Sequence, residues 1–167
     1  MTTGFRARKA LTSTILLSYF LGGCSAGETT MSAEEFREFA TRYTAAWNSN
    51  DPTSVAAFFA EDGTLSVNGS PAVGRDAITT VARGFMVGFP DLVLHMDNLM
   101  VTENLVAYHW TFVGTNSGPD GTGNSVRFSG YEEWTFNGDG LVANSDGHFD
   151  SDEYQYQLEN GASPSQP

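Results

Sequence analysis

The sequence is poor in cysteine and in basic residues. Its 167 residues contain one cysteine, Cys24, and eight lysines and arginines against twenty aspartates and glutamates. A single cysteine cannot form a disulfide within the chain. The resulting net charge of −12 argues against nucleic acid as a partner and against electrostatic docking on anionic lipid. The composition therefore indicates a well-solvated, acidic protein.

Several motifs of well-known sites are absent as well. Closely spaced histidine ligands such as H-x-H or H-E-x-x-H do not occur, and His95, His109 and His148 would meet only if three strands turned them inward together. There is no glycine-rich phosphate loop between a strand and a helix. The sequence therefore predicts no metal and no cofactor.

The longest apolar stretch, residues 11–21, is too short for a membrane-spanning helix. Three basic residues precede it, and Gly22, Gly23 and Cys24 follow it. A charged start, a short apolar stretch and a small-residue exit are typical of an export signal. The Leu-Gly-Gly-Cys ending resembles the lipobox of bacterial lipoproteins, whose cysteine is lipidated and becomes the mature N-terminus. An ordinary signal peptide with a chance cysteine is the alternative.

The expected export signal sets the first boundary in the organisation of the chain. We expect a lipoprotein signal peptide at residues 1–23, a lipidated tether at 24–31, one domain at 32–158 and a disordered tail at 159–167. Without its signal the chain keeps five arginines and no lysine against twenty acids, a net charge of −15. The expected location is the bacterial cell envelope, on the periplasmic or extracellular face, with the lipid anchor as the only attachment to the membrane.

The first half of the domain has helical periodicity. Residues 32–35, Ser-Ala-Glu-Glu, form a capping box, and the apolar positions that follow recur at helical spacing. Pro52 begins a short second helix that extends through Phe59, and residues 75–89 form a third, closed by Gly88 and Pro90. Residues 63–69 predict a brief strand and turn.

The second half has the pattern of strands. Apolar and aromatic stretches at residues 92–101, 105–115, 126–136 and 141–149 are separated by turn-forming segments. Residues 151–158 predict a final helical turn. Helices followed by an antiparallel meander indicate an α+β fold, with the helices packed on one face of the sheet.

Several segments in this order resemble the SnoaL-like branch of the nuclear transport factor 2-like superfamily: YTAAWNSNDPTSVAAFFAEDGTL, GRDAI, FPDLVLHMDNLMV, VAYHWTFVGTNSG, YEEWTFNGDGLV and FDSDEYQYQL. The resemblance covers residues 32–158. It implies a cone-shaped, curved antiparallel sheet wrapped by three N-terminal helices around an apolar pocket. The superfamily contains polyketide cyclases, ketosteroid isomerases, dehydratases, epoxide hydrolases and many non-enzymes, so the fold does not select a function.

Glu132 is the first candidate for chemistry. In the strand at residues 126–136, alternation places it on the face of Phe128 and Trp134, where it is the only ionisable group. Burial among aromatic rings would raise its pKa and let it act as an acid near neutral pH. The resemblance places Glu132 near the strand position where ketosteroid isomerases hold a protonated acid. A solvated glutamate at the mouth of the cone is the alternative.

Tyr43 is the second candidate. It lies four residues before Trp47 on the inward face of the first helix, and the resemblance matches it to the tyrosine that donates to the developing oxyanion in the isomerases. A core tyrosine with its hydroxyl at the rim is the alternative. The catalytic base of the isomerases falls at or near Val67, which cannot take a proton. This argues against steroid isomerisation in that form.

The segment SDGHFD supplies the third candidate pair. On a strand, Asp146, His148 and Asp150 would share one face. The resemblance implies a His-x-Asp pair in this strand of the cyclases, in which Asp146 matches the aspartate but Asn144 replaces the histidine. His148 could still shuttle a proton with Asp146. A polar outer strand face is the alternative, and Asp150 looks like a cap for the terminal turn.

Two functions remain open at this level. The first is a pocket domain that binds a small apolar molecule, with Trp47, Trp110, Phe128 and Trp134 as ligand contacts. The second is an acid/base enzyme of cyclase, isomerase or hydrolase type that uses Asp146, His148, Glu132 and Tyr43. The replaced histidine and the missing isomerase base favour the binding domain slightly. The burial of the Asp146 side chain would discriminate between these two functions: a pocket-lining Asp146 beside Glu132 supports the enzyme, and a solvated one supports the binding domain.

A homodimer is also expected. The strands present aromatic residues on both faces, and helices can cover only one of these faces. An exposed apolar sheet face favours pairing with a second copy of the chain.

Overall fold

The computed structural model describes Met1, residues 31–102 and residues 105–163. Outside the described residues lie the predicted export signal from residue 2 onward, Cys24, the tether up to residue 30, residues 103–104 and the end of the tail at 164–167. Within the described ranges, no helix is both long and apolar enough to cross a membrane.

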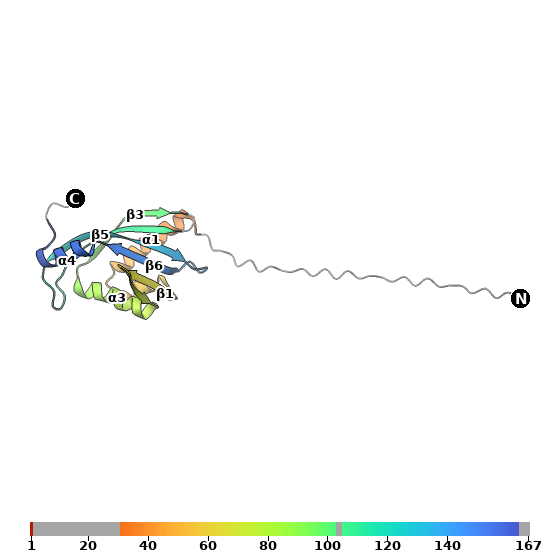
Figure 1. Ribbon diagram of the computed structural model, residues 1–167, viewed down its shortest axis with the longest axis horizontal. Coiled ribbons are helices and arrows are strands. Elements are labelled where there is room, and N and C mark those ends of the chain that lie inside the picture. The colour runs from red at the N-terminus through yellow and green to blue at the C-terminus, as the bar shows by residue number, and fades with distance from the viewer. Residues whose placement is uncertain (2–30, 103–104, 164–167) are drawn as a thin grey trace.

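The described chain folds as an α+β domain, as the sequence predicts (Figure 1). Three of its helices precede the four strands that lie between residues 93 and 149, and the last helix follows these strands. The elements in chain order are α1 (Ala33–Trp47), α2 (Pro52–Ala56), β1 (Phe59–Val67), β2 (Ser70–Val73), α3 (Arg75–Gly88), β3 (Val93–Val101), β4 (Val106–Thr115), β5 (Ser125–Phe136), β6 (Val142–Phe149) and α4 (Ser151–Asn160).

Helix α1 begins at the predicted capping box. The Ser32 hydroxyl accepts from the Glu35 N–H at 3.3 Å, and the Ser32 N–H donates to the Glu35 carboxylate at 2.7 Å. At the other end, the Asn48 side chain donates to the Leu94 carbonyl at 2.9 Å and accepts from the Leu94 N–H at 2.7 Å. These paired bonds fix the end of α1 against β3, so the inward face of the helix keeps one position over the sheet.

The six strands form one curved, unclosed sheet in the order β2-β1-β6-β5-β4-β3. Neighbouring strands are antiparallel except β1 and β6, which are parallel. The parallel pair is possible because the whole of β2 to β5 separates β1 from β6 along the chain. It brings Val67 beside Gly147 and so joins the N-terminal hairpin to the last strand.

One local prediction was wrong, and one strand was missed. Phe59 does not end the second helix but begins β1, because Phe59 and Ala60 are buried in the sheet and α2 stops at Ala56. The second strand of the first hairpin, β2, was not predicted. It is four residues long and contains Pro71, which is tolerated because β2 is an edge strand.

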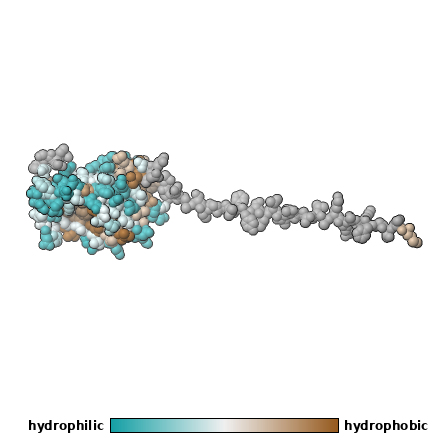
Figure 2. Space-filling view, in the orientation of Figure 1, coloured by the Kyte–Doolittle hydropathy of each residue, from teal (hydrophilic) through white to brown (hydrophobic). Residues whose placement is uncertain are grey.

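The core lies between the helices and the concave face of the sheet. Phe39 of α1 meets Trp134 of β5 edge-on at 5.6 Å between ring centroids, and Phe89, just after α3, meets Phe112 of β4 at 5.1 Å. Such edge-to-face contacts are favourable beyond the apolar area that they bury. The outer surface is mostly hydrophilic in the view of Figure 2, with smaller apolar patches.

Candidate functional site

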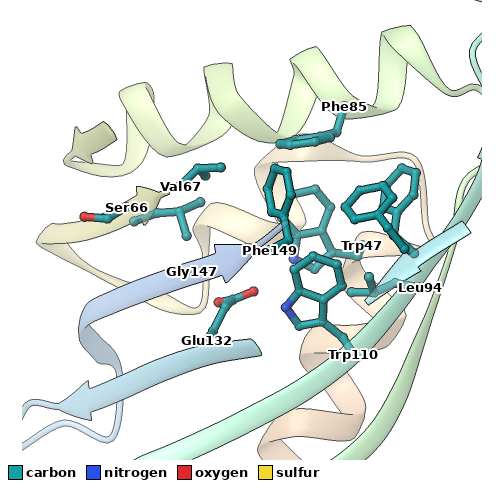
Figure 3. Close-up of a pocket in the computed structure, with 12 residues that line it drawn as sticks. Trp47, Ser66, Val67, Phe85, Leu94, Trp110, Glu132, Gly147 and Phe149 are labelled. Atoms are coloured by element: carbon teal, nitrogen blue, oxygen red, sulfur yellow. The ribbon is translucent and has the colours of Figure 1, made fainter. Parts of the chain in front are cut away.

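A pocket opens into the core between β1, helices α1 and α3, and the concave face of the sheet (Figure 3). Its volume is about 50 Å³. One buried water needs roughly 10–15 Å³ of such space, so the pocket suits a small molecule. The lining residues are Trp47, Leu65, Ser66, Val67, Phe85, Leu94, Trp110, Phe112, Phe128, Glu132, Gly147 and Phe149.

Three of the four expected ligand contacts, Trp47, Trp110 and Phe128, line this pocket. Trp134 is not among the lining residues. Its ring stacks on Tyr108 at 4.7 Å and its indole N–H donates to Glu132 at 2.9 Å. Trp134 therefore supports the lining residue Glu132 and does not itself line the pocket.

Sequence reasoning missed several lining residues, of which Phe85, Phe112 and Phe149 are the largest. Phe112 could have been found, because it alternates with Trp110 on β4 and shares its face. Phe149 could have been found in the same way, since it shares a face of β6 with Ser145 and Gly147. Phe85 lies on α3, and only the packing of that helix over the sheet brings it to the pocket.

Glu132 lies on the buried face of β5 and is only 6% exposed. Its Oε2 atom accepts from three donors: the Ser145 hydroxyl at 2.7 Å, the Trp134 indole at 2.9 Å and the Tyr43 hydroxyl at 3.1 Å. The donors come from β6, β5 and α1, so the carboxyl ties three elements together. Ser145 is fully buried and is the member of this group that the sequence did not reveal.

Burial raises the pKa of the Glu132 carboxyl, because the charged form loses its hydration. The hydrogen bonds from Trp134, Ser145 and Tyr43 favour the charged form and oppose this effect, but burial prevails. Burial, with the neighbouring Glu132 charge, also raises the pKa of the Tyr43 phenol well above its usual value. Tyr43 therefore stays protonated and acts as a donor to the carboxyl.

The two oxygens of Glu132 differ in their free capacity. Oε2 has three short contacts, whereas Oε1 has one long contact of 3.4 Å from the Tyr43 hydroxyl. A carboxyl oxygen has lone pairs for about two hydrogen bonds. Oε1 is therefore the oxygen with capacity for a ligand, and it is the natural position for the proton of the neutral acid.

Asp146 and His148 lie on the other face of the sheet. They pair in register with Glu133 and Tyr131, which point away from the core. Their side chains are 45% and 39% exposed, and His148 Nε2 lies 3.6 Å from Asp146 Oδ2. An ion pair this exposed contributes little to stability. Asp146 is therefore solvated and not beside Glu132, which is the outcome expected for a binding domain.

The other polar candidates also lie outside the pocket. His109 faces Tyr131 at 5.7 Å, and Tyr131 faces His148 at 5.1 Å, in a row across the outer face of β4, β5 and β6. Asp150 caps α4 by accepting from the N–H groups of Asp152 and Glu153, both at 3.0 Å. Among the residues that the structure describes, no three His, Cys, Asp or Glu side chains are grouped as metal ligands.

Residues 40–145 match the SnoaL-like domain family. The chain belongs to this family. The matched residues contain helix α1 from its middle onward, Glu132 and the pocket-lining residues other than Gly147 and Phe149, and they end at Ser145. No curated protein sequence matches the chain significantly.

Solved structures share the fold of this SnoaL-like domain. A Catenulispora acidiphila protein with a ketosteroid isomerase-like fold, in complex with trimethylamine, has a TM-score of 0.66 at 16% identity, covering 78% of this chain and 98% of that one. TsrD from Streptomyces laurentii has a TM-score of 0.67 at 20% identity, covering 77% of this chain and 97% of that one. SalBIII, an epoxide hydrolase/cyclase-like enzyme of pyran ring formation in the polyether salinomycin, has a TM-score of 0.62 at 17% identity, covering 74% and 97%.

Proposed function

We propose that this SnoaL-like domain binds a small, mostly apolar molecule in the pocket between its helices and the concave sheet face. The carrying observation is the pocket itself: two tryptophans and four phenylalanines line it, and Glu132 is the only ionisable residue among its described lining residues. Concave sites with mostly apolar walls and few polar groups are the usual form of small-molecule sites.

A second candidate function, acid/base catalysis, is favoured by Glu132 alone. Its raised pKa and its uncommitted Oε1 are what a general acid needs. The predicted partners Asp146 and His148 lie on the opposite face, so they cannot act on the same bound molecule as Glu132. Catalysis would be supported over binding alone if the protein converts a bound compound and Glu132→Gln loses this conversion while it still binds the compound.

The binding proposal is tested by filling the pocket. Val67 lines the pocket, and Val67→Trp should occupy it with the new ring. Titration of the purified protein with toluene, followed by amide NMR, should shift the signals of Gly147 and Phe149. We expect Val67→Trp to weaken this binding at least tenfold, because the apolar surface offered to toluene is already covered.

The matched control is Val73→Trp, the same substitution at an exposed position of β2. It should bind toluene as the unmodified protein does. Absence of saturable binding to the unmodified protein, or equal binding by the two tryptophan variants, would overturn the proposal.

We further propose that the domain is held at the cell envelope by lipid on Cys24. The support is the lone cysteine at the end of an export signal. Stable anchoring needs more than one acyl chain, and bacterial lipoproteins carry theirs on this residue. Cys24→Ser in the native host should move the protein from the membrane to the soluble fraction. Retention with the membrane would contradict the anchor.

Pairing of two copies through the outer sheet face is proposed as well. Tyr131, Val93 and Met100 are exposed apolar residues of the central and edge strands that the helices leave uncovered. Light scattering at tens of micromolar protein should give the mass of a dimer, and Tyr131→Lys should convert it to the mass of one chain. A monomer mass for the unmodified protein would exclude this pairing.

A further inference from the structure

Trp110 carries a buried hydrogen-bond donor without a partner. The residue is 8% exposed, and its indole N–H has no acceptor among the residues that the structure describes. The indole N–H of Trp47 also has no hydrogen-bond partner among the described residues, but it lies beside the Tyr43 phenol and lowers the pKa of that group, so it has a polar neighbour. An unpaired buried donor is rare in native proteins because it loses its bond to water.

The unpaired N–H belongs to a residue whose position is tightly constrained. Trp110 pairs with Gly130 in register, and a Cβ on Gly130 would lie 2.5 Å from the Trp110 ring. Phe128 and Phe149 meet the ring edge-on at 5.8 and 6.2 Å. Aromatic faces at such distances are weak acceptors. The indole cannot turn to find a better one without displacing these rings.

Trp110 and Glu132 face the same part of the pocket. Both line it, and Figure 3 shows the Trp110 indole nitrogen and the Glu132 carboxyl turned toward one another across it. No hydrogen bond joins them in the described structure. Together they present one fixed donor, the Trp110 N–H, and one carboxyl oxygen, Oε1, with capacity to spare.

The unpaired donor restricts the chemistry of a ligand that binds in the pocket beside Trp110 and Glu132. A carbonyl oxygen could accept from Trp110 and from the neutral Glu132 acid, and a hydroxyl could accept from Trp110 while donating to Glu132. An alkylammonium group has only donors, so it would leave the Trp110 N–H unpaired. A hydrocarbon would leave the Trp110 N–H unpaired and would not use the remaining hydrogen-bond capacity of Glu132 Oε1.

We propose that Trp110 and Glu132 form a two-point site for an oxygen atom of the ligand. This proposal rests on the proposed binding function. The ligand is then an uncharged, mostly apolar molecule that carries a carbonyl or hydroxyl oxygen. The aromatic walls hold its apolar body, and Trp110 determines the specificity for oxygen over a cationic amine.

Three probes of similar size test this. Cyclohexanone carries the acceptor, methylenecyclohexane replaces the oxygen with a CH₂ group, and cyclohexylammonium carries a cation. We expect cyclohexanone to bind roughly tenfold more tightly than either of the others, because only cyclohexanone gives the buried Trp110 N–H an acceptor. In NMR spectra of the ¹⁵N-labelled protein, the Trp110 indole N–H signal should move downfield with cyclohexanone only.

Two protein variants separate the contribution of the Trp110 N–H from that of the apolar pocket wall. Trp110→Phe should remove the preference for cyclohexanone over methylenecyclohexane, whereas Phe85→Leu, which alters the wall without a polar atom, should weaken both probes and keep the preference. Equal affinity for the three probes, with an unmoved indole signal, would overturn the two-point site and leave the binding function standing. Failure of all three to bind would instead overturn the binding function.

Discussion

Replacement of Glu132 by leucine should destabilise the fold by on the order of 3–5 kcal/mol, whereas glutamine should cost about 1 kcal/mol or less. Leucine leaves three buried donors, the Tyr43 and Ser145 hydroxyls and the Trp134 indole, without their acceptor. Each unpaired buried donor costs about 1–3 kcal/mol. Glutamine keeps an acceptor oxygen at the position of Oε2 and resembles the neutral acid in shape.

The pH dependence of stability gives a second measure of the same group. The Glu132 pKa is raised in the folded protein, so the acid binds its proton more tightly there than in the unfolded chain. Its contribution to stability is therefore fully present below the unfolded pKa of about 4.3 and is lost as the pH rises through the folded pKa. Between these values the slope approaches about 1.4 kcal/mol per pH unit.

Urea unfolding of the unmodified protein and of Glu132→Gln, from pH 4 upward, measures this contribution. The free energy of unfolding of the unmodified protein should fall relative to the glutamine variant as the pH rises. A difference that is independent of pH, or a leucine variant as stable as the glutamine variant, would contradict the buried, proton-binding carboxyl.

Alanine in place of Gly130 should also have a large effect, about 3 kcal/mol of destabilisation together with loss of ligand binding. The added Cβ would lie 2.5 Å from the His148 carbonyl and 2.5 Å from the Trp110 ring. Because β5 is hydrogen-bonded to β4 on one side and β6 on the other, its backbone cannot retreat. The Trp110 ring must move instead, and it forms one wall of the pocket.

Gly84→Ala is the matched control, since this glycine is exposed on α3 and a Cβ there would meet nothing within 4 Å. It should stabilise the protein by about 0.5–1 kcal/mol, because alanine is the better helix former. Thermal unfolding of both variants measures the effects, and toluene titration measures the pocket. Equal melting temperatures of the two variants would show that the contact at Gly130 is relieved without cost.

Local patterns were sufficient to predict much of the fold. The capping box at Ser32 and the helical spacing after it predicted α1, and the alternation from 126 to 136 placed Glu132 and Trp134 on the same face of β5. These predictions succeed because each depends on neighbours within one helical turn or one strand. The resemblance of the segments to the SnoaL-like family then supplied the curved sheet and the helices that wrap it around an apolar pocket.

Local patterns misled where a choice depended on distant residues. Alternation gave β6 two possible inward faces, one with Asp146 and His148 and the other with Ser145, Gly147 and Phe149. The sequence drew attention to the face with titratable groups, but the pairing of Gly147 with Glu132 turns the other face into the core. The alternation within one strand does not determine which of its two faces is buried, because that depends on the strands and helices that pack against it.

By itself, the sequence determined the α+β class, the position of most helices and strands, and the buried face of β5, because these follow from periodicities within single elements. Only the tertiary structure decided that Glu132 has three donors on one oxygen, that Trp134 supports the pocket while Trp110 lines it, and that the Trp110 N–H has no described partner. The reason is physical: a hydrogen bond among α1, β5 and β6 depends on distances between residues up to 89 positions apart in the chain, and these distances are set by the packing of the whole sheet against its helices.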